Sequence, residues 1–510
     1  MNTSDYLLGA AAPDDIALVD GGVNHSYGEL RFAASKLAAQ LSALGLQPGS
    51  RVGILGVNSV FWVAAYLAIM KLGLVAVPFS DKATLDETRR NADLVGCAAA
   101  MIDRRSLRRF GPAFDDVPVI TDESLTSDLE PFWPSASLSD PHADAVLMFT
   151  SGTTSAPKAV RVTHTNIQAN TESIASYLDL CSTDRALVIL PFFYCYGASL
   201  LHTHLRRGAR VVLCNSFVFP ETATDMLEEQ GCTVFAGVPS SFQLLLRATS
   251  FASRELPSLR IIQQAGGRLS PVLVDELVAA KPGAKVFVMY GQTEATARLS
   301  YLPPEKLRTK SGSIGSGIPG VELRVLGDDM EPVAAGEIGE IYARGANISP
   351  GYYGDPQGSL AKITPYGLRT GDLAVADSDG DIFIVDRRDD FIKSWGYRVS
   401  SQEVEAAALQ LPHLVSAAAV GVADLDAGEA VSLFVTVRPG STVSVEDVLA
   451  GCRERLAKHM VPRTVTILDE MPLNANGKIA KTRLRDIASA SVGSKEARHR
   501  RGSVRGATET

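Results

Sequence analysis

Short apolar runs alternate with helical patterns through much of residues 26–330, and this alternation restricts the possible folds more than any other feature. The runs are rich in Val, Ile, Leu and Ala, and Gly, Pro or charged residues bound them. Because a strand, a crossover helix and a second strand form a parallel pair, the pattern predicts βαβ units on largely parallel sheets. The expected strands are Arg51–Leu55, Leu74–Pro78, Ala98–Ile102, Ala186–Leu190, Ala209–Leu213, Thr233–Ala236, Leu259–Gln263 and Lys285–Met289.

Two later regions differ from this pattern. Residues 311–388 alternate strand-like runs with glycine turns, which is typical of an antiparallel subdomain. After Asp390, Ser444 and Asp447 form a capping box that predicts a helix from about Val445 to His459. The other elements expected there are a helix at Ser401–Leu409 and strands near Ser416–Val422 and Val431–Val437.

The chain of 510 residues exceeds the size at which one hydrophobic core usually keeps growing. We therefore predict an α/β protein whose large N-terminal domain, residues 1–388, combines βαβ-type sheets with a β-rich subdomain. Residues 389–487 are expected to form a small, mobile α+β domain. Residues 488–510 are rich in Ser, Gly and Arg without apolar periodicity, which predicts a disordered basic tail.

Composition narrows the partners and the compartment. A formal net charge of -8 disfavours a nucleic acid as the main partner. Six cysteines without a CxxC pair favour reduced thiols over disulfides or a zinc site. The N-terminus lacks the pattern of a secretion signal, and the longest apolar run, Val60–Met70, is about half a membrane span. We expect a cytoplasmic protein with no membrane span and no structural metal; the sequence does not indicate an oligomeric state.

A hydroxyl-rich segment follows the apolar run Ala145–Phe149. Backbone N–H groups, hydroxyl donors and one lysine in a turn can surround phosphate oxygens, so this segment predicts a phosphate cradle. It is not a Walker loop, because no GK[ST] follows a correctly spaced glycine. Its proposed ATP-binding members are Thr150, Ser151, Gly152, Thr153, Thr154 and Lys158.

The segment TSGTTSAPK resembles the phosphate loop of the acyl-adenylate-forming superfamily, which includes acyl-CoA synthetases, nonribosomal peptide adenylation domains and luciferases. The likeness extends over about residues 15–485, with the family's signatures in the expected order, and is nearest to stand-alone acyl- or aryl-CoA ligases. The further matching segments are Ser26–Leu30, Tyr290–Glu294, Thr370–Asp372, Arg387–Lys393 and Pro472–Lys478.

The resemblance implies ATP and Mg²⁺ as cofactors and gives roles to individual residues. Glu294 would hold Mg²⁺, Thr293 would contact the α-phosphate, and Lys478 would bridge the carboxylate and the α-phosphate. Asp372 would accept the ribose hydroxyls, with Arg387 supporting the ribose or phosphates. The remaining ATP-binding candidates are Gly266, Gly267, Tyr290, Gly291 and Gln292.

Other roles concern the acid and the acceptor thiol. The resemblance makes Asp389 the hinge about which the small domain rotates between half-reactions, and it places Lys393 and Gly396 along the thiol tunnel. The acid is expected to lie in an apolar pocket with few polar groups. The residues expected to line that pocket are Tyr194, Tyr196, Gly197, Val238, Ser240, Ala265 and Met289.

The chemistry explains why these residue types suffice. A carboxylate that attacks the α-phosphorus of ATP is already a nucleophile, so positioning and charge stabilisation matter more than a general base. The chain departs from the family at Ser155 and Ala159, where glycines are usual, and at Tyr194, where His is common. No Asp lies between Leu190 and Leu201 to hold an ammonium group, which disfavours a free α-amino acid.

Three interpretations remain open at this point. The first is a ligase that joins a small carboxylic acid to coenzyme A through acyl-AMP, with release of pyrophosphate. The second is a stand-alone ligase that loads the phosphopantetheine of an acyl carrier protein in secondary metabolism. The third is a homologue that activates an unusual acid such as nitrite, or one that binds nucleotide without turnover.

Overall fold

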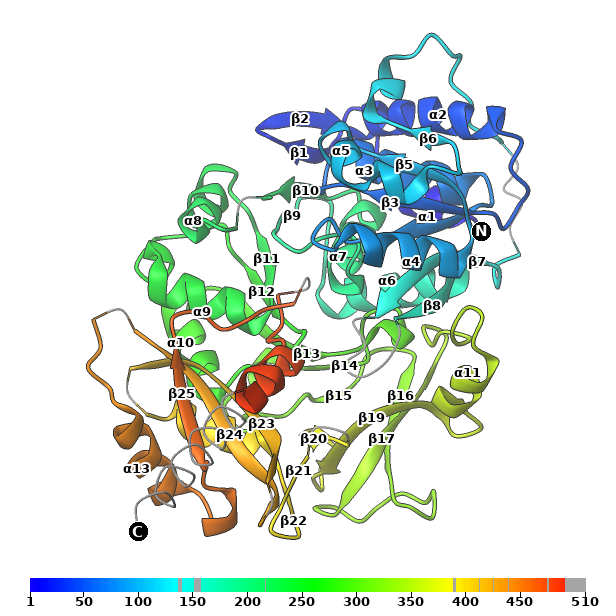
Figure 1. Cartoon of the computed structure of the whole chain (residues 1–510). Helices are drawn as coiled ribbons and strands as arrows, with labels where there is room; N and C mark the ends of the chain where they lie inside the picture. The colour runs from blue at the N-terminus through cyan, green and yellow to red at the C-terminus, as the bar shows by residue number, and fades with distance from the viewer. Residues whose placement is uncertain are drawn as a thin grey trace, which may run out of the picture. The chain divides into compact units, whose positions relative to one another are not determined.

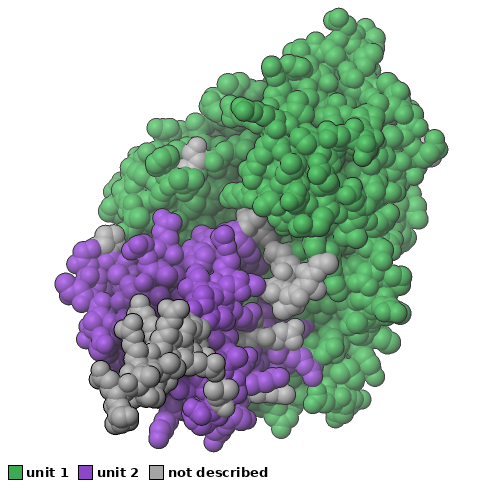
Figure 2. Space-filling model, in the orientation of Figure 1, with its two compact units in different colours: residues 1–370, 376–383 green, residues 371–375, 384–510 purple. Residues whose placement is uncertain are grey.

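A computed structural model describes residues 1–135, 140–150, 157–215, 217–388, 391–411, 413–424, 426–438, 440–474 and 477–490. The chain forms two compact units, coloured separately in Figure 2. The first unit comprises Met1–Thr370 and Ala376–Phe383, and the second comprises Gly371–Val375 and Ile384–Thr510. The predicted fold class, α/β with a large and a small domain, is confirmed.

A nine-stranded sheet runs through the first unit (Figure 1). Its six central strands are parallel to their neighbours, whereas β2, β14 and β15 pair in antiparallel fashion at its two edges. Most predicted strands are therefore confirmed, with ends shifted by one or two residues. In sheet order the strands are β15 (Ser316–Gly317), β14 (Ser300–Leu302), β13 (Lys285–Tyr290), β12 (Ile261–Gln264), β11 (Val234–Gly237), β9 (Arg185–Val188), β10 (Arg210–Leu213), β1 (Ile16–Asp20) and β2 (Val23–Ser26).

A second, six-stranded sheet is parallel except for one hairpin, in which β7 and β8 are antiparallel. In this hairpin Thr150 lies opposite Lys158, so the hydroxyl-rich segment connects two paired strands. The order is β6 (Val119–Ile120), β5 (Cys97–Ile102), β3 (Arg51–Leu55), β4 (Val75–Pro78), β7 (Asp144–Thr150) and β8 (Lys158–Thr163).

Two buried helices lie between these sheets: α3 (Val60–Lys71) packs on β3 and β4, and α7 (Cys195–Arg206) packs on β9 and β10. Helix α3 is apolar on every side, which fits a helix enclosed by protein. The Ser59 hydroxyl caps it by accepting the Trp62 N–H at 3.2 Å. The two helices meet where the Tyr66 hydroxyl and a ring nitrogen of His202 are 2.9 Å apart.

Of the remaining helices of the first unit, α1, α2 and α6 pack against α3 or α7. Helices α8, α9 and α10 lie on one face of the nine-stranded sheet and form a core with it around Phe235 and Phe242 (Figure 1). The bounds are α1 (Thr3–Leu8), α2 (Tyr27–Ala43), α4 (Leu85–Val95), α5 (Arg104–Phe110), α6 (His164–Tyr177), α8 (Pro220–Glu229), α9 (Pro239–Ala248), α10 (Pro271–Ala280) and α11 (Pro356–Lys362), with short 3₁₀ turns η1 (Gly111–Phe114), η2 (Asp122–Thr126), η3 (Ser250–Ala252), η4 (Thr293–Ala295) and η5 (Pro304–Lys306).

The β-rich region predicted at residues 311–388 is confirmed as a five-stranded sheet with antiparallel pairs. The division between the two compact units passes through its strands β19 and β20, whereas the sequence predicted a boundary at residue 388. The strands are β16 (Val321–Leu326), β17 (Ile338–Gly345), β18 (Ile363–Thr364), β19 (Gly367–Ala376) and β20 (Ile382–Arg387).

The second unit has its own core, in which α12 (Ser401–Leu409) and α13 (Val445–Arg455) pack on a sheet. The predicted capping box of Ser444 and Asp447 is present. Helix α13 ends earlier than predicted because Leu456 is extended, and the turn η6 (Lys458–Met460) follows. The strands, in sheet order, are β22 (Tyr397–Val399), β21 (Ile392–Ser394), β24 (Gly428–Val437) and β23 (Leu414–Asp424), with β25 (Thr464–Leu468) beside β24.

Neither unit offers a helix that could cross a bilayer, as far as the described residues go. All six cysteines are free.

Candidate active site

The predicted acid- and adenine-binding residues gather at one edge of the nine-stranded sheet. Strands β9, β11, β12 and β13 are parallel neighbours, so their carboxyl ends meet along this edge. Ligands of open α/β sheets bind in the crevice outside such ends. The residues that follow the four strands here include Tyr194, Val238, Ala265 and Gly291.

The segment after β9 leads into α7, for which Tyr194 is the N-cap residue. A side chain at Gly197 is excluded, since its Cβ would lie 2.1 Å from the carbonyl oxygen of Pro191. This close contact aligns Tyr194 and Tyr196, whose rings meet edge to face at 6.3 Å. Both rings are buried, as are Val238, Ala265 and Met289, so these predicted pocket residues lie in the interior near the same edge.

Gly266 and Gly267 follow Ala265 at the end of β12. Gly266 has a φ of +87°, a left-handed conformation that favours glycine. At Gly267 a Cβ would lie 3.2 Å from a ring carbon of Pro239, at the start of α9 beside Ser240. Two consecutive residues here have no side chain, so a flat ring could approach the backbone closely.

A sharp turn follows β13. A Cβ on Gly291 would lie 1.8 Å from the carbonyl oxygen of Ala297, so this turn requires glycine. Gln292 caps the 3₁₀ turn η4, which contains Thr293 and Glu294. The Thr293 hydroxyl donates to the Cys195 sulfur at 3.5 Å and thereby faces the start of α7.

Glu294 is linked to the phosphate-loop hairpin through Tyr352. The Tyr352 hydroxyl donates to Glu294 Oε1 at 2.7 Å, and the Glu294 carbonyl accepts the Ser349 N–H at 2.9 Å. The ammonium of Lys158 lies 4.6 Å from the centre of the Tyr352 ring and 3.5 Å from an oxygen of Asp355. Burial, and then the charge of Glu294, raise the pKa of Tyr352, so its hydroxyl remains a donor.

This geometry brings together the predicted metal-holding carboxylate and the predicted phosphate-binding lysine. Among the described residues, no hydrogen bond or ion pair takes Glu294 Oε2. A half-buried carboxylate with one oxygen available fits a hard cation such as Mg²⁺, which prefers oxygen ligands. Of the phosphate loop itself, Thr150 and Lys158 are described, whereas the predicted residues Ser151, Gly152, Thr153 and Thr154 lie outside the described residues.

Sequence reasoning missed two buried polar residues beside the pocket, Arg298 and Gln263. The guanidinium carbon of Arg298 lies 4.8 Å from the centre of the Tyr196 ring. The Tyr196 hydroxyl donates to the carbonyl oxygen of Gln263 at 2.9 Å. An arginine four residues after Glu294, in an otherwise small and apolar stretch, was the available sequence signal.

In the second unit, Asp372 and Arg387 lie together. Arg387 Nε is 3.3 Å from Asp372 Oδ1, and the Arg388 N–H donates to the Gly371 carbonyl at 2.9 Å. The Asp372 side chain is 8% exposed and that of Arg387 is 56% exposed, so the arginine covers the carboxylate from the solvent side. The two residues predicted to bind the ribose therefore form an ion pair with each other.

Lys478 stands in a loop that Asn474 organises. The Asn474 side-chain oxygen accepts the Lys478 N–H at 3.0 Å, and its backbone N–H donates to the Lys478 carbonyl at 2.7 Å. Gly477 has a φ of +75°, which this turn requires. The Lys478 side chain is half-buried.

The predicted thiol-tunnel residues lie on the hairpin β21–β22. Ser394 is opposite Tyr397, so Trp395 and Gly396 form a two-residue loop. Their φ values of +54° and +80° are those of a type I′ turn. Lys393 is exposed on β21. The predicted hinge residue Asp389 lies outside the described residues.

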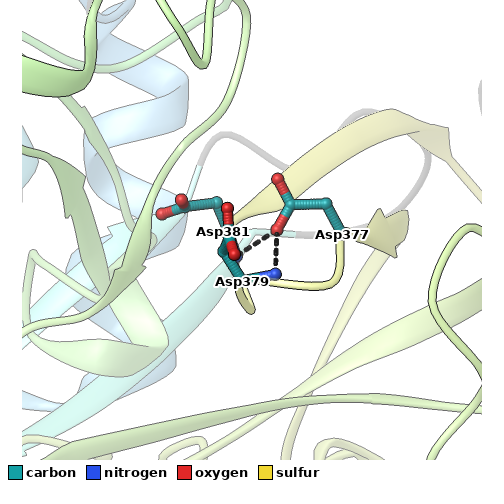
Figure 3. A group of neighbouring side chains, drawn as sticks. All are labelled: Asp377, Asp379 and Asp381. Atoms are coloured by element: carbon teal, nitrogen blue, oxygen red, sulfur yellow. Dashed lines mark hydrogen bonds between the residues drawn. The ribbon is translucent and has the colours of Figure 1, made fainter.

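Three carboxylates gather elsewhere, in the turn between β19 and β20 (Figure 3). Oδ1 of Asp377 accepts the N–H groups of Asp379 and Asp381 at 3.0 Å each. Lys310 lies 2.7 Å from Asp377 and contacts Asp379, and Lys306 lies 2.9 Å from Asp381. Two lysines thus pair with these three acids, and the cluster is a structural ion-pair network.

Comparison with known families decides the identity of the fold and its site. The model of the AMP-binding enzyme family matches residues 9–353, and the model of the AMP-binding enzyme C-terminal domain matches residues 403–478. The chain belongs to the AMP-binding enzyme family.

Named relatives of this AMP-binding enzyme are ligases. It is 32% identical to feruloyl-CoA synthase from Amycolatopsis sp over 93% of this chain and 96% of the relative. It is also 32% identical to 2-succinylbenzoate–CoA ligase from Bacillus velezensis, over 94% and 96%. The predicted class, an AMP-forming acid–thiol ligase, is confirmed at the level of the family.

The structure of o-succinylbenzoate CoA synthetase from Bacillus subtilis with ATP and magnesium ion matches the AMP-binding enzyme with a TM-score of 0.85 at 29% identity, covering 95% of this chain and 99% of that one. The same Bacillus subtilis enzyme has been crystallised with its acyl-adenylate intermediate. The first of these complexes holds ATP and Mg²⁺, two of the cofactors that the sequence predicted.

Proposed function

We propose that the protein activates a small carboxylic acid with ATP and Mg²⁺ and transfers the acyl group to coenzyme A. The observation that carries the proposal is the chain of contacts Lys158–Tyr352–Glu294, which joins a phosphate-binding cation to a metal-holding carboxylate. These groups lie in the same unit as the buried residues near the carboxyl ends of β9 to β13 that we propose line the acid pocket.

In the first half-reaction, a carboxylate oxygen attacks the α-phosphorus of ATP. The new O–P bond forms as the bond from the α-phosphorus to the bridging oxygen breaks, and pyrophosphate leaves with that electron pair. Mg²⁺, when bound, supplies positive charge that neutralises the phosphates. Glu294 would hold it, Thr293 would orient the α-phosphate, and the phosphate-loop residues with Lys158 would fix the β- and γ-phosphates.

Lys478 would place its ammonium between the carboxylate and the α-phosphate, where negative charge accumulates. Since it belongs to the second compact unit, its entry and departure would require that unit to rotate, with Asp389 as the pivot. Asp372 and Arg387, already paired, would bind the ribose.

In the second half-reaction, the thiol sulfur attacks the acyl carbon. The C–S bond forms, AMP leaves with the electrons of the C–O bond, and the thiol proton passes to solvent. Lys393 and Gly396 would line the approach of the thiol. The named relatives form coenzyme A esters, which favours coenzyme A over a carrier protein's phosphopantetheine as the acceptor.

A screen for pyrophosphate release over a panel of carboxylic acids, with and without coenzyme A, tests this proposal. At least one acid should give pyrophosphate and AMP in the presence of ATP and Mg²⁺, and coenzyme A should convert the bound adenylate into a thioester. If no acid gives AMP, the proposed activity is wrong. A thioester formed only on an acyl carrier protein would replace coenzyme A as the acceptor.

The variant Lys478→Ala should reduce adenylate formation by roughly 10²–10³-fold, because one preorganised donor to the transition state is lost. Lys458→Ala is the matched control, since Lys458 is an exposed lysine of the same unit in the turn η6. Unchanged adenylation in Lys478→Ala would overturn the role given to this lysine.

A further inference from the structure

Arg298 is a fully buried cation held by its backbone. It is 1% exposed. Its carbonyl oxygen accepts from the side-chain amides of Asn170 at 3.0 Å and Asn347 at 2.9 Å, and its N–H donates to Asn170 at 3.3 Å. Three hydrogen bonds therefore fix the point from which the side chain extends.

The guanidinium itself is under-satisfied. Nε and Nη2 have no hydrogen-bond partner, and no described carboxylate forms an ion pair with it. Lys71, another buried cation of this unit, contrasts with it, because it is 3% exposed and lies 2.7 Å from the carboxylate of Asp5. A buried charge is normally paired, since an unpaired one is costly to remove from water.

The groups that surround Arg298 do not neutralise it. The Tyr196 ring lies against the guanidinium at 4.8 Å, and Tyr177, stacked on Tyr301 at 4.0 Å, is also near. Burial raises the pKa of Tyr196 and raises that of Tyr177 to about 12, so both phenols stay neutral. The face of Tyr196 offers a cation–π contact, which does not cancel the charge, and Nε and Nη2 stay without hydrogen-bond partners.

A second buried residue with an unpartnered side chain contacts the same tyrosine through its backbone. Gln263 is 1% exposed, and neither its amide nitrogen nor its amide oxygen has a partner. Its backbone carbonyl oxygen accepts a hydrogen bond from the Tyr196 hydroxyl at 2.9 Å. Native proteins satisfy most buried polar groups, so the unpartnered guanidinium nitrogens beside Tyr196 point to a polar partner supplied from outside the chain.

The location indicates what that partner is. Tyr196 and Met289 belong to the predicted acid pocket, and the Tyr177 hydroxyl contacts the Met289 sulfur at 3.1 Å. Arg298 lies on the segment that runs from Glu294 to β14, so one segment carries both the metal-holding carboxylate and this cation. A partner of the guanidinium would therefore be part of the acid that the enzyme activates.

We propose that Arg298 binds a second carboxylate of the substrate, so that the enzyme activates one end of a dicarboxylic acid. The planar guanidinium presents parallel N–H donors that match the two oxygens of a carboxylate. The inference rests on the proposed function, because it assigns the substrate class of the same site.

The test compares each diacid with its own monomethyl ester, which retains one reacting carboxylate and loses the second charge. Pyrophosphate release is measured for succinate through suberate and for the three benzenedicarboxylates. We expect at least one diacid to exceed its ester in kcat/KM by about 30-fold or more, the low end of the cost of unpairing a buried charge. In Arg298→Met the same ratio should fall to about 1 or below, since an apolar side chain favours the ester.

Two further variants show whether the charge or only the bulk of Arg298 matters. Arg298→Lys keeps the charge without the paired donors and should give an intermediate ratio. Arg308→Met, which removes an exposed arginine ten residues further along, should leave the ratio unchanged.

The wild-type ratios decide the proposal even if Arg298→Met does not fold. If monocarboxylic acids are adenylated and no diacid exceeds its ester, Arg298 does not bind a second carboxylate, while the proposed function stands. If no acid at all yields AMP, the proposed function itself fails. A diacid preference that persists in soluble Arg298→Met would also overturn the assignment.

Discussion

Glu294 and Arg298 lie four residues apart on one segment, yet their surroundings are opposite. Glu294 is half-exposed and is held by the Tyr352 hydroxyl, beside the ammonium of Lys158. Arg298 is buried against Tyr196, and two of its side-chain nitrogens have no partner. The same segment therefore carries a carboxylate that another side chain holds through Oε1 and a cation that no described carboxylate pairs with.

This difference separates what the family's common chemistry needs from what one substrate needs. The nucleotide site is used with every acid, so the charged groups of that site are held in place by other residues of the chain. The acid side must fit a particular molecule, and a polar group there obtains its partner only when that molecule binds. Substitutions on the two sides should consequently change different measurements.

The largest effect is expected at Glu294. Replacing it in Glu294→Gln removes the negative charge proposed to hold Mg²⁺, and adenylation should fall by roughly 10²–10³-fold with every acid. The preference for a diacid over its ester should not change, since the substitution acts on the nucleotide side. Initial rates of pyrophosphate release with each diacid and with its monomethyl ester measure both effects. A changed preference would show that the nucleotide site and the acid site do not act independently.

A smaller effect is expected at the tyrosine that holds Glu294. Tyr352→Phe removes the hydroxyl 2.7 Å from the carboxylate. Loss of such a supporting group typically costs about 10–100-fold in metal affinity, so the Mg²⁺ concentration for half-maximal rate should rise by that factor.

The adjacent variant Tyr353→Phe is the control for Tyr352→Phe, because the Tyr353 ring instead lies 5.6 Å from the guanidinium of Arg51. An unaltered Mg²⁺ requirement in Tyr352→Phe would show that Glu294 does not depend on this contact.

A buried histidine that has a partner within the chain should make the stability depend on pH. Burial lowers the pKa of His202 to about 3, and His202 pairs with Tyr66. The unfolded chain then binds a proton below about pH 6.5 that the folded chain does not, so stability is complete above that pH and declines as the pH falls. The contribution is up to about 1.4 kcal/mol per pH unit.

Urea unfolding of the wild type and of His202→Gln between pH 6.5 and 4.5 measures this slope. The slope should be smaller in the variant, while His142→Gln, at an exposed histidine, should retain the wild-type slope. Equal slopes in all three proteins would contradict the burial of a neutral His202.

The smallest expected effect concerns stability at Arg298. Since its guanidinium is unpaired, Arg298→Met should leave the melting temperature unchanged or raise it. Lys71→Met, in contrast, leaves Asp5 without its cation and should destabilise the first unit by about 1 kcal/mol or more. Differential scanning calorimetry without ligand distinguishes the two. A large loss in Arg298→Met would make the arginine a structural residue.

Local pattern was enough to predict the elements that are governed by their own sequence. The apolar run Val60–Met70 became the enclosed helix α3, and helix α12 occupies the predicted residues 401–409. The capping box at Ser444 fixed the start of α13, whereas its end depended on Leu456 turning into an extended conformation. Start signals lie in the first turn of a helix, but where it ends is often set by tertiary packing.

The site was predictable where a short motif carries it, and not where distant segments meet. Glu294 and Lys158 stand out in sequence, but the contact between them runs through Tyr352, which comes from a loop after β17. Tyr196, one of the residues expected to line a mostly apolar pocket, contacts Arg298 and Gln263, which come from two separate segments. Their lack of partners is visible only when helices, strands and loops are placed in space.

Transfer of an isotope from the acid to AMP tests the central claim most directly. The acid that releases most pyrophosphate is labelled with ¹⁸O in its carboxylate and converted fully to the thioester. Attack of a carboxylate oxygen on the α-phosphorus predicts one ¹⁸O atom in each AMP, with none in pyrophosphate. Label in inorganic phosphate together with ADP, or AMP free of label, would contradict adenylation as the chemistry of this enzyme.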